Sequence, residues 1–533
     1  MDAKVNRIIL TGFMGSGKST VGQLLAKQAR MRFVDTDALI MAMAQRTVTD
    51  IWAEGEAVFR HWEQQAIASL VDESNLVIAT GGGAITLPET RGLLQMMGPI
   101  VCLDAPCDTL WQRVGLDPER PLAQSRETFE ALYQQRQATY AAIAWRVDTQ
   151  HQTPAAIASR ILNQWRDTQR TVQVPLGDRS YTIHIGCGNL HTLPHLLDGP
   201  PRACLLVVDN QVPEHFFYTL THSLHYTGWT PHVIRVPAGE DSKNFVQAQR
   251  LYDACVRANL HRNDPILALG GGMVGDLAGF VAATYQRGVP FVQIPTTLLA
   301  QIDASVGGKV AINHAAAKNL IGCFHQPRTV LCDLTTLLTL DGRQYRAALA
   351  EMVKYAIIAD AGLFEEIVEQ VTAIERRDLI VLSALVARCL VIKARLVAAD
   401  ERETADNQRV LLNFGHTLGH ALEQVSGYGV LLHGEAVAIG MHFACQLATQ
   451  LGYAHASLIQ SLSDLLRRLE LPITPPHAAV DDWLNAIQHD KKNRHDAVTF
   501  VVATSIGEAT TIRLKPETLR QPLRDFAGTS QTP

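Results

Sequence analysis

The sequence lacks the cysteine pattern that marks a secreted or disulfide-stabilised protein. Its nine cysteines are scattered, with no C-x-x-C pair among them. A chain of 533 residues, 47% of them hydrophobic, can bury several cores and needs no disulfide framework. This composition predicts a protein of the reducing cytoplasm.

The sequence also lacks a large net charge of either sign and long apolar runs. The formal net charge is only −5, which gives no electrostatic footprint for nucleic acid or anionic lipid. No uncharged run reaches the roughly eighteen apolar residues of a membrane span, and the first residues run into a glycine-rich loop where a signal peptide would have a cleavage site. We therefore expect no nucleic-acid partner and no membrane association, and we expect small acidic ligands to be bound by local basic clusters.

The residue pattern predicts an α/β protein with several domains. Short β-rich runs alternate with amphipathic helix-length runs in the first part, which indicates a parallel sheet with crossover helices. After the polar stretch RDTQR, a second series of strands begins with two strands around a Gly-Asp turn, and helical periodicity dominates near the end. The predicted units are an α/β domain over 1–165, a linker over 166–170, an α/β domain over 171–341 and a mostly helical domain over 342–533.

A phosphate-binding loop stands near the start of the chain. Residues 12–19, GFMGSGKS, match G-x-x-x-x-G-K-[ST] between a predicted strand and a predicted helix. In such a loop, backbone amides face the phosphates, the lysine reaches the β- and γ-phosphates, and the hydroxyl ligates Mg²⁺. The motif predicts a nucleotide with Mg²⁺, bound by Gly15, Ser16, Gly17, Lys18, Ser19 and Thr20.

Further motifs in residues 1–165 resemble shikimate kinase. FVDTDALI, GEAVFRHWE, ATGGGAI, RVGLDPERPL, YQQRQATY and RVDT occur in the order found in that family. The resemblance implies a P-loop kinase that transfers phosphate from ATP to the 3-hydroxyl of shikimate. Because a carboxylate is held well by guanidinium groups, it implies a shikimate site formed by Asp37, Arg60, Gly82, Gly83 and Arg136.

The same resemblance implies roles for residues around the phosphates. Asp35 would lie near the Mg²⁺ that Ser19 ligates, and Arg113 would contact ATP. Arg120 would be the lid arginine that binds ATP and stabilises the transferred charge. Asp37 is the candidate to orient or deprotonate the acceptor hydroxyl, since an unassisted hydroxyl is a poor nucleophile.

Three histidines gather in residues 413–437, NFGHTLGHALEQVSGYGVLLHGEAV. His416 and His420 are four residues apart and share one face of a predicted helix, whereas His433 follows a Gly-Tyr-Gly break and must come from another element. Imidazoles that converge from two elements indicate a metal site or a proton-transfer site.

The second half resembles 3-dehydroquinate synthase. LALGGGMVGD reads as G-x-G-x-x-G but lacks the expected ribose-binding acid, so alone it is a weak signal. However, PAGEDSKN, YQRGVPFVQIPTTLLAQIDASVGGK, AKNLIG, AEMVKY, KARLVAADERE, the histidine stretch and DKKN follow in the order of that family over about 171–515. The resemblance implies an NAD- and metal-dependent enzyme that converts 3-deoxy-D-arabino-heptulosonate 7-phosphate to 3-dehydroquinate and phosphate, and typically a homodimer.

Residue roles follow from this resemblance. The ligands of a zinc or cobalt ion would be Glu351, His416 and His433, and His420, Glu403, Lys309, Arg409 and Asn413 would be catalytic. The NAD site of the 171–341 domain would be lined by Asp209, Glu240, Lys243, Gly271, Gly272, Asp276, Thr296, Thr297 and Lys318. The heptulosonate phosphate would be held by Arg287, Asp303, Lys309, Asn319, Lys354, Lys393, Arg409, Asn413, His420 and one of Lys491 or Lys492.

Two features depart from the family pattern. The stretch from Glu403 to Arg409 is two residues longer than usual, so we expect the loop that presents Glu403 to be displaced. Ala347 and Ala348 stand where the family has a small polar residue and glycine. We expect weaker NAD binding from this change, by about one neutral hydrogen bond, or 0.5 to 1.5 kcal/mol.

The sequence leaves other functions possible for the second half. Another sugar-phosphate cyclase or a metal-dependent alcohol dehydrogenase could share the fold, but a small alcohol would not need the cations Arg287, Lys309, Lys354, Lys393 and Arg409. A third hypothesis makes one half an inactive module. The complete P-loop and the complete metal-ligand set argue against it.

Overall fold

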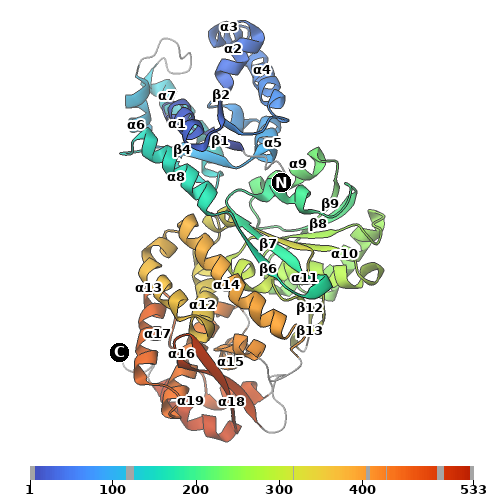
Figure 1. Cartoon of the computed structure of the whole chain (residues 1–533), viewed down its shortest axis with the longest axis vertical. Coiled ribbons are helices and arrows are strands. Elements are labelled where there is room, and N and C mark those ends of the chain that lie inside the picture. The colour runs from blue at the N-terminus through green and yellow to red at the C-terminus, as the bar shows by residue number, and fades with distance from the viewer. Residues whose placement is uncertain are drawn as a thin grey trace.

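The computed structural model describes residues 7–115, 125–315, 317–403, 408–427, 429–488 and 497–528. Figure 1 shows three structural units along the long axis of the molecule, in chain order. The predicted α/β class is confirmed, with parallel sheets in the first two units and a largely helical third unit. No helix within the described ranges is long and apolar enough to cross a membrane.

The first unit is a parallel five-stranded sheet in the order β2-β3-β1-β4-β5. Its buried strands read as continuous apolar runs because helices cover both faces. The strands are β1 (Arg7–Thr11), β2 (Arg32–Asp35), β3 (Leu76–Ala79), β4 (Ile100–Asp104) and β5 (Arg146–Asp148). The helices are α1 (Lys18–Ala29), α2 (Thr36–Ala44), α3 (Val48–Ala53), α4 (Glu56–Ser69), α5 (Pro88–Met97), α6 (Cys107–Val114), α7 (Arg126–Ala141) and α8 (Pro154–Asp167).

The second unit is a seven-stranded sheet in the order β6-β7-β14-β11-β10-β8-β9. Its first two strands form the predicted hairpin around the Gly-Asp turn, and the others run parallel. The strands are β6 (Arg170–Val174), β7 (Tyr181–Gly186), β8 (Ala203–Asp209), β9 (Thr230–Val236), β10 (Ile266–Gly270), β11 (Phe291–Pro295) and β14 (Thr329–Asp333). The unit also contains α9 (Glu214–Tyr226), α10 (Phe245–Arg257), α11 (Gly272–Thr284) and the hairpin β12 (Lys309–His314) with β13 (Ala317–Phe324).

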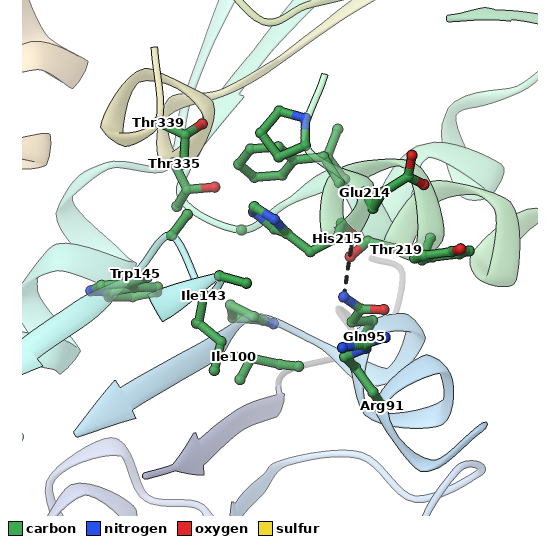
Figure 2. A pocket seen from close by; sticks show the side chains of 18 of the residues that line it. Arg91, Gln95, Ile100, Ile143, Trp145, Glu214, His215, Thr219, Thr335 and Thr339 are labelled. Atoms are coloured by element: carbon green, nitrogen blue, oxygen red, sulfur yellow. Dashed lines mark hydrogen bonds between the residues drawn. The ribbon is translucent and has the colours of Figure 1, made fainter. Parts of the chain in front are cut away.

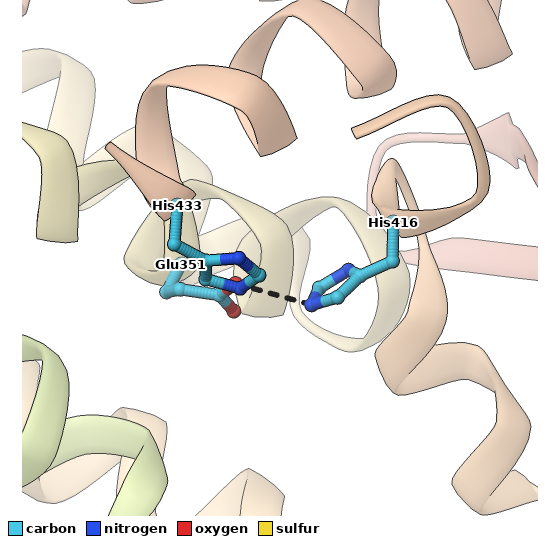
Figure 3. A group of neighbouring side chains, drawn as sticks. All are labelled: Glu351, His416 and His433. Atoms are coloured by element: carbon cyan, nitrogen blue, oxygen red, sulfur yellow. Dashed lines mark ion pairs between the residues drawn. The ribbon is translucent and has the colours of Figure 1, made fainter. Parts of the chain in front are cut away.

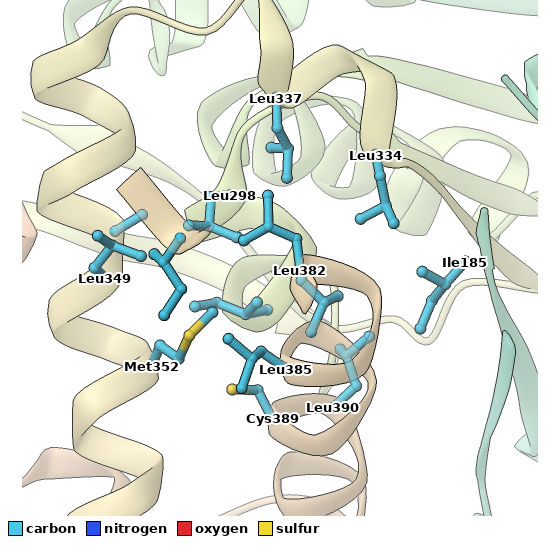
Figure 4. Close-up of a cluster of buried hydrophobic side chains, with 14 of the residues drawn as sticks. Ile185, Leu298, Leu334, Leu337, Leu349, Met352, Leu382, Leu385, Cys389 and Leu390 are labelled. Carbon is cyan, nitrogen blue, oxygen red and sulfur yellow. The ribbon is translucent and has the colours of Figure 1, made fainter. Parts of the chain in front are cut away.

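The third unit is built from packed helices and one hairpin that was not predicted. The hairpin strands β15 (Val498–Ser505) and β16 (Glu508–Leu514) are antiparallel. The helices are α12 (Gly342–Ala359), α13 (Ala361–Glu375), α14 (Leu379–Ala399), α15 (His416–Ser426), α16 (His433–Gln450), α17 (Ala456–Arg468), α18 (Val480–Gln488) and α19 (Arg520–Gly528). Figure 4 shows Leu349 and Met352 of α12 facing Leu385 and Cys389 of α14 in the largest apolar cluster.

This cluster does not stop at the border of the first unit. It includes Ile157 and Ile161 of α8 as well as Ile183 of β7 and Leu385 of α14. Only two residues separate α8 from β6, and Arg170 Nε donates a 3.3 Å hydrogen bond to Ser383 Oγ of α14. The kinase-like unit is therefore docked on the rest of the chain through a shared apolar core.

Candidate active sites

One cavity of about 730 Å³ in the first unit contains the P-loop and the predicted acceptor residues. Parallel strands present their carboxyl ends on one edge of a sheet, and the loops that follow β1, β2 and β3 meet there. Of the predicted residues, the cavity wall includes Gly15, Ser16, Gly17, Lys18, Ser19, Thr20, Asp35, Asp37, Arg60, Gly82, Gly83, Arg113 and Arg136. Arg120 lies outside the described residues.

The phosphate end of this cavity has the geometry that an ATP–Mg²⁺ complex requires. Gly17 caps α1 with φ of 91°, a left-handed conformation that glycine adopts without strain. Lys18 Nζ lies within the loop and donates to the carbonyl of Gly12 at 2.9 Å. Ser19 Oγ donates to Asp35 Oδ2 at 2.6 Å, so the two predicted magnesium residues are adjacent. These residues fit ATP with Mg²⁺.

The acceptor end of the cavity is formed by guanidinium groups next to glycines. A Cβ on Gly83 would lie 2.3 Å from Arg60 Nη2, and one on Gly82 would lie 3.5 Å from Arg136 Nη1. A side chain at Gly83 would therefore displace Arg60. Arg113, at the other end, is fixed by donating to Thr149 Oγ1 at 2.9 Å and to the Thr149 carbonyl at 2.7 Å.

Glu63 is a site residue that the sequence reasoning missed. Its side chain is fully buried, lines the cavity and pairs with Arg60 Nη1 at 2.7 Å. Burial raises the pKa of Glu63, and the charge of Arg60 opposes that rise. The spacing of Arg60 and Glu63, three residues apart on α4, was the available signal.

The second site is centred on Glu351, His416 and His433, which come from three different helices (Figure 3). One ligand atom of each lies within 4.8 Å of the others. His416 Nε2 is 3.4 Å and His433 Nε2 is 3.5 Å from Glu351 Oε1. His416 and His433 are the first residues of α15 and α16, so the two helix starts bring them together.

These three residues fit a divalent cation. Glu351 is fully buried, Lys354 Nζ forms an ion pair with its Oε2, and its Oε1 faces the two imidazoles. A carboxylate oxygen and two imidazole nitrogens are ligand types that a divalent zinc-like cation binds. Three protein ligands with an open fourth position are the arrangement of catalytic zinc sites.

The far nitrogens of both imidazoles have partners. His416 Nδ1 lies 3.1 Å from the Phe414 carbonyl, and His433 Nδ1 lies 3.2 Å from Glu423 Oε2. With both Nδ1 atoms engaged in this way, both Nε2 atoms face Glu351. His420, Glu423 and His433 form a second possible ligand group, but in it Glu423 already takes the role of hydrogen-bond acceptor. The ring of His420 lies 5.5 Å from that of His416, centroid to centroid, beside the predicted metal ligands.

The predicted NAD residues gather at the carboxyl edge of the second sheet. Asp209 is the last residue of β8, and Gly270 is the last residue of β10, its neighbour. A Cβ on Gly271 would lie 3.2 Å from Thr297 Cγ2, so the backbone of this turn stays open because it has no side chain. Thr296, Thr297, Gly272 and Asp276 lie on the same turn–helix edge. A cradle of this kind at the start of α11 fits a dinucleotide.

A network of buried charge connects this edge with the hairpin β12–β13. Lys243 Nζ contacts both Asp276 and Asn319 Oδ1. Asn313 Nδ2 donates to Glu240 Oε1 at 2.8 Å, which ties the Glu240 turn to the same hairpin. Lys318 Nζ lies 3.7 Å from Glu423, so the predicted NAD residues extend to the carboxylate that contacts His433 Nδ1.

Basic residues line the region beside the metal ligands. Lys393 Nζ lies 2.8 Å from Asp303 Oδ1, and Tyr355 donates to the same oxygen at 2.5 Å. The cations Lys393 and Lys354 keep the pKa of Asp303 well below its usual range even though burial opposes this. Tyr355, which follows Lys354 directly, is a further residue that was not predicted.

Glu403 lies between two of the predicted cations. Its Oε1 is 2.5 Å from Lys309 Nζ and 3.5 Å from Arg409 Nε. The two-residue insertion falls on residues outside the described ranges, and Glu403 itself stays within the basic cluster. Asn413 ends the 3-10 helix that begins at Gln408, three residues before His416.

Arg287, which is predicted to bind the substrate, lies apart from the predicted NAD residues of α11. Arg287 is exposed and follows the C-terminal end of α11, whereas Gly272 and Asp276 lie at its N-terminal end, about 20 Å away along a helix of 13 residues. Lys491 and Lys492 lie outside the described residues. Ala347 and Ala348 are buried, and the carbonyl of Ala347 would lie 1.8 Å from a Cβ on Gly434, so this segment packs closely against α16.

Comparison with known proteins agrees with these two sites. Residues 14–166 match the family model of shikimate kinase, 233–347 that of the 3-dehydroquinate synthase N-terminal domain, and 348–493 that of its C-terminal domain. The chain is 46% identical over 347 residues to a 3-dehydroquinate synthase of Geobacter metallireducens, covering 65% of this chain and 96% of that protein. A second 3-dehydroquinate synthase, of Desulforamulus reducens, is 45% identical over 63% of this chain and 94% of its own.

A solved structure extends the comparison to the fold. The 2-epi-5-epi-valiolone synthase of Streptomyces hygroscopicus, determined with NAD⁺ and Zn²⁺ bound, aligns with a TM-score of 0.61 and 28% identity. The alignment covers 66% of this chain and 97% of that protein. The chain is 46% identical to a 3-dehydroquinate synthase and 28% identical to this other cyclase. The comparison therefore favours 3-dehydroquinate synthase over another sugar-phosphate cyclase.

Proposed function

We propose that this chain, which belongs to the 3-dehydroquinate synthase family and carries a shikimate kinase domain ahead of it, performs its two reactions through the residues described above. The protein has shikimate kinase and 3-dehydroquinate synthase activities. ATP with Mg²⁺ serves the first, and NAD with Zn²⁺ or Co²⁺ serves the second.

In the kinase, Lys18 and the P-loop amides would hold the phosphates, with Ser19 and Asp35 on the magnesium side. Arg60 and Arg136 would bind the carboxylate of shikimate at the opposite end of the cavity. Asp37 lies in the wall of the same cavity and would orient the acceptor hydroxyl. Arg120 keeps its predicted lid role, to be tested by substitution.

In the synthase, Glu351, His416 and His433 would hold the metal ion. When bound, the metal would polarise a substrate oxygen, and NAD⁺ would accept and return a hydride. The cations next to the site, Lys309, Lys354, Lys393 and Arg409, would bind a substrate that carries both a carboxylate and a phosphate. His420 would move a proton beside the metal ligands, and Glu403 would set the positions of Lys309 and Arg409.

The observation that best supports this proposal is that one buried carboxylate and two imidazoles, from three helices, bring their ligand atoms within 4.8 Å of one another. The test measures phosphate release from 3-deoxy-D-arabino-heptulosonate 7-phosphate with and without NAD⁺, before and after exhaustive chelation. Release should need both NAD⁺ and metal, whereas shikimate-dependent ADP formation in Mg²⁺ should survive removal of zinc or cobalt. Full phosphate release after chelation would refute the metal assignment.

We also infer a homodimer formed through the synthase half, which the family resemblance implies. Light scattering after size exclusion should give twice the chain mass of 58.5 kDa. A single-chain mass at micromolar concentration would refute it.

A further inference from the structure

A cavity of about 380 Å³ lies between the two enzymes, and neither predicted site includes it. Its walls come from α5 and the segment before β5 on the kinase side, and from α9 and the segment after β14 on the synthase side (Figure 2). The volume is within the range of about 300 to 1,000 Å³ that is typical of small-molecule sites. The cavity is therefore large enough for a ligand that touches both enzymes.

Most of the wall is apolar. Figure 2 shows Ile100, Ile143 and Trp145 of the kinase on one side of the cavity, with His215 of α9 pointing toward them. Leu190 and Phe216 add apolar surface from the synthase. Such walls favour a molecule with rings or other apolar groups.

Two buried polar atoms in this wall lack hydrogen-bond partners: Gln95 Oε1 and His215 Nε2. Gln95 is only 5% exposed, and its Nε2 donates to the His215 carbonyl at 3.3 Å. That bond fixes which end of the amide faces the partner helix and leaves the oxygen as an unused acceptor. Because buried polar groups without partners are rare, these two atoms point to a molecule that would satisfy them.

The cavity also presents one positive charge. Arg91 lines it and has no carboxylate partner among the described residues. The two acids of the wall are engaged elsewhere: Glu214 pairs with Arg235 at 2.8 Å, and Asp333 accepts from the amides of Gly188 and Leu190. Burial, with the nearby charge of Arg91, lowers the pKa of His215 to about 4, so this ring is neutral near pH 7.

We propose that this cavity is a binding site for a small, mostly apolar organic anion. Its acidic group would face Arg91, and a hydrogen-bond donor would face Gln95 Oε1. The occupant would contact kinase and synthase at once, so its binding would strengthen the contact between the two enzymes. The inference rests on the cavity itself and not on the roles proposed for either active site.

The test uses the full-length protein with ADP, Mg²⁺, shikimate and NAD⁺ at saturating concentrations, so that the kinase site and the nucleotide part of the synthase site are filled. The probe is 1-anilinonaphthalene-8-sulfonate, which has apolar rings, one N–H donor and a sulfonate. Its fluorescence should report one saturable site per chain. Ala144→Phe, which places a ring in the cavity, should abolish the signal.

Two variants of polar residues distinguish specific binding of the anion from nonspecific binding in an apolar cavity. Arg91→Met should weaken binding on the order of tenfold, as loss of a charged hydrogen bond does, while Arg160→Met, at an exposed arginine of α8, should leave it unchanged. Gln95→Leu should weaken binding by up to about tenfold. Both enzyme activities should persist in these variants, because none of the residues belongs to either active site.

Several outcomes would overturn the proposal. These are unchanged binding in Ala144→Phe, several equivalent sites per chain, or equal affinities of Arg91→Met and Arg160→Met. If Ala144→Phe does not fold, the comparison of the two arginine variants decides alone.

Discussion

His433 and Glu423 are joined through the imidazole nitrogen that faces away from the other two metal-ligand candidates. Nδ1 of His433 lies 3.2 Å from Glu423 Oε2, while Nε2 of the same ring lies 3.5 Å from Glu351. A carboxylate in this place fixes the ring orientation and the nitrogen that carries the proton. Glu423 is therefore placed to be an outer partner of the proposed metal site.

Replacing Glu423 by Gln should weaken zinc binding by about 10- to 100-fold, since outer carboxylates contribute on that scale. The control is Glu366→Gln on α13, whose carboxylate pairs with Arg388. Competition with a chromogenic zinc chelator gives both affinities. Equal affinities for the two variants would show that Glu423 has no such role.

Replacing His416 by Ala should remove bound zinc and abolish phosphate release, because only two ligands would remain. Shikimate-dependent ADP formation should be unchanged, since His416 belongs to the third structural unit. Metal content by mass spectrometry and the two assays check this. His455→Ala, at an exposed histidine before α17, is the control, and a stoichiometric zinc content in His416→Ala would contradict the ligand assignment.

Replacing Lys18 by Met should lower the kinase kcat by at least about 10²-fold, the cost of losing one charge-stabilising donor in a transition state. Synthase activity should not change. Lys27→Met, on the last turn of the same helix and exposed, controls for helix stability. A kinase rate near that of the parent would remove Lys18 from the reaction.

Replacing Arg60 by Leu should destabilise the kinase by about 3 kcal/mol, because Glu63 stays buried without its partner. It should also raise the KM for shikimate. The double change with Glu63→Leu should recover most of the stability but not the KM. Thermal unfolding and initial rates measure the two effects.

The stability of the single variant Arg60→Leu should also depend on pH. Burial already raises the pKa of Glu63, and loss of Arg60 would raise it further above the ordinary value of 4.5. The folded state then binds more protons than the unfolded state, so stability falls as pH rises from that value through the folded pKa. Arg60→Leu should lose more stability at about pH 8 than at about pH 5, and the double variant should show no such difference.

The architecture could be predicted from the sequence because helical and strand periodicities are local. The P-loop, the alternating runs and the helical last part all gave the right class. The hairpin β15–β16 was missed because it is one pair of strands within a helical context. The strands β2 and β5, which have four and three residues, were too short to show a pattern.

Parts of the sites were less accessible to sequence reasoning. The family motifs indicate the proposed metal ligands, but nothing in the sequence places Glu423 against His433 or Tyr355 against Asp303, since these contacts join different elements. Glu63 is an ordinary polar residue of an amphipathic helix until its burial is known. The cavity between the enzymes depends on how two domains dock, which no local pattern records.

The apolar cluster that runs from α8 through β7 to α14 makes the stability of each enzyme depend on the other in the cell. A substitution that removes packing contacts of Ile161 or Leu385 would lower the stability of both units. Quality-control proteases act on unfolded chains, so about 1 to 2 kcal/mol of lost stability can change abundance several-fold. Such a mutation would deplete two separate steps of metabolism together, although it touches the chemistry of neither.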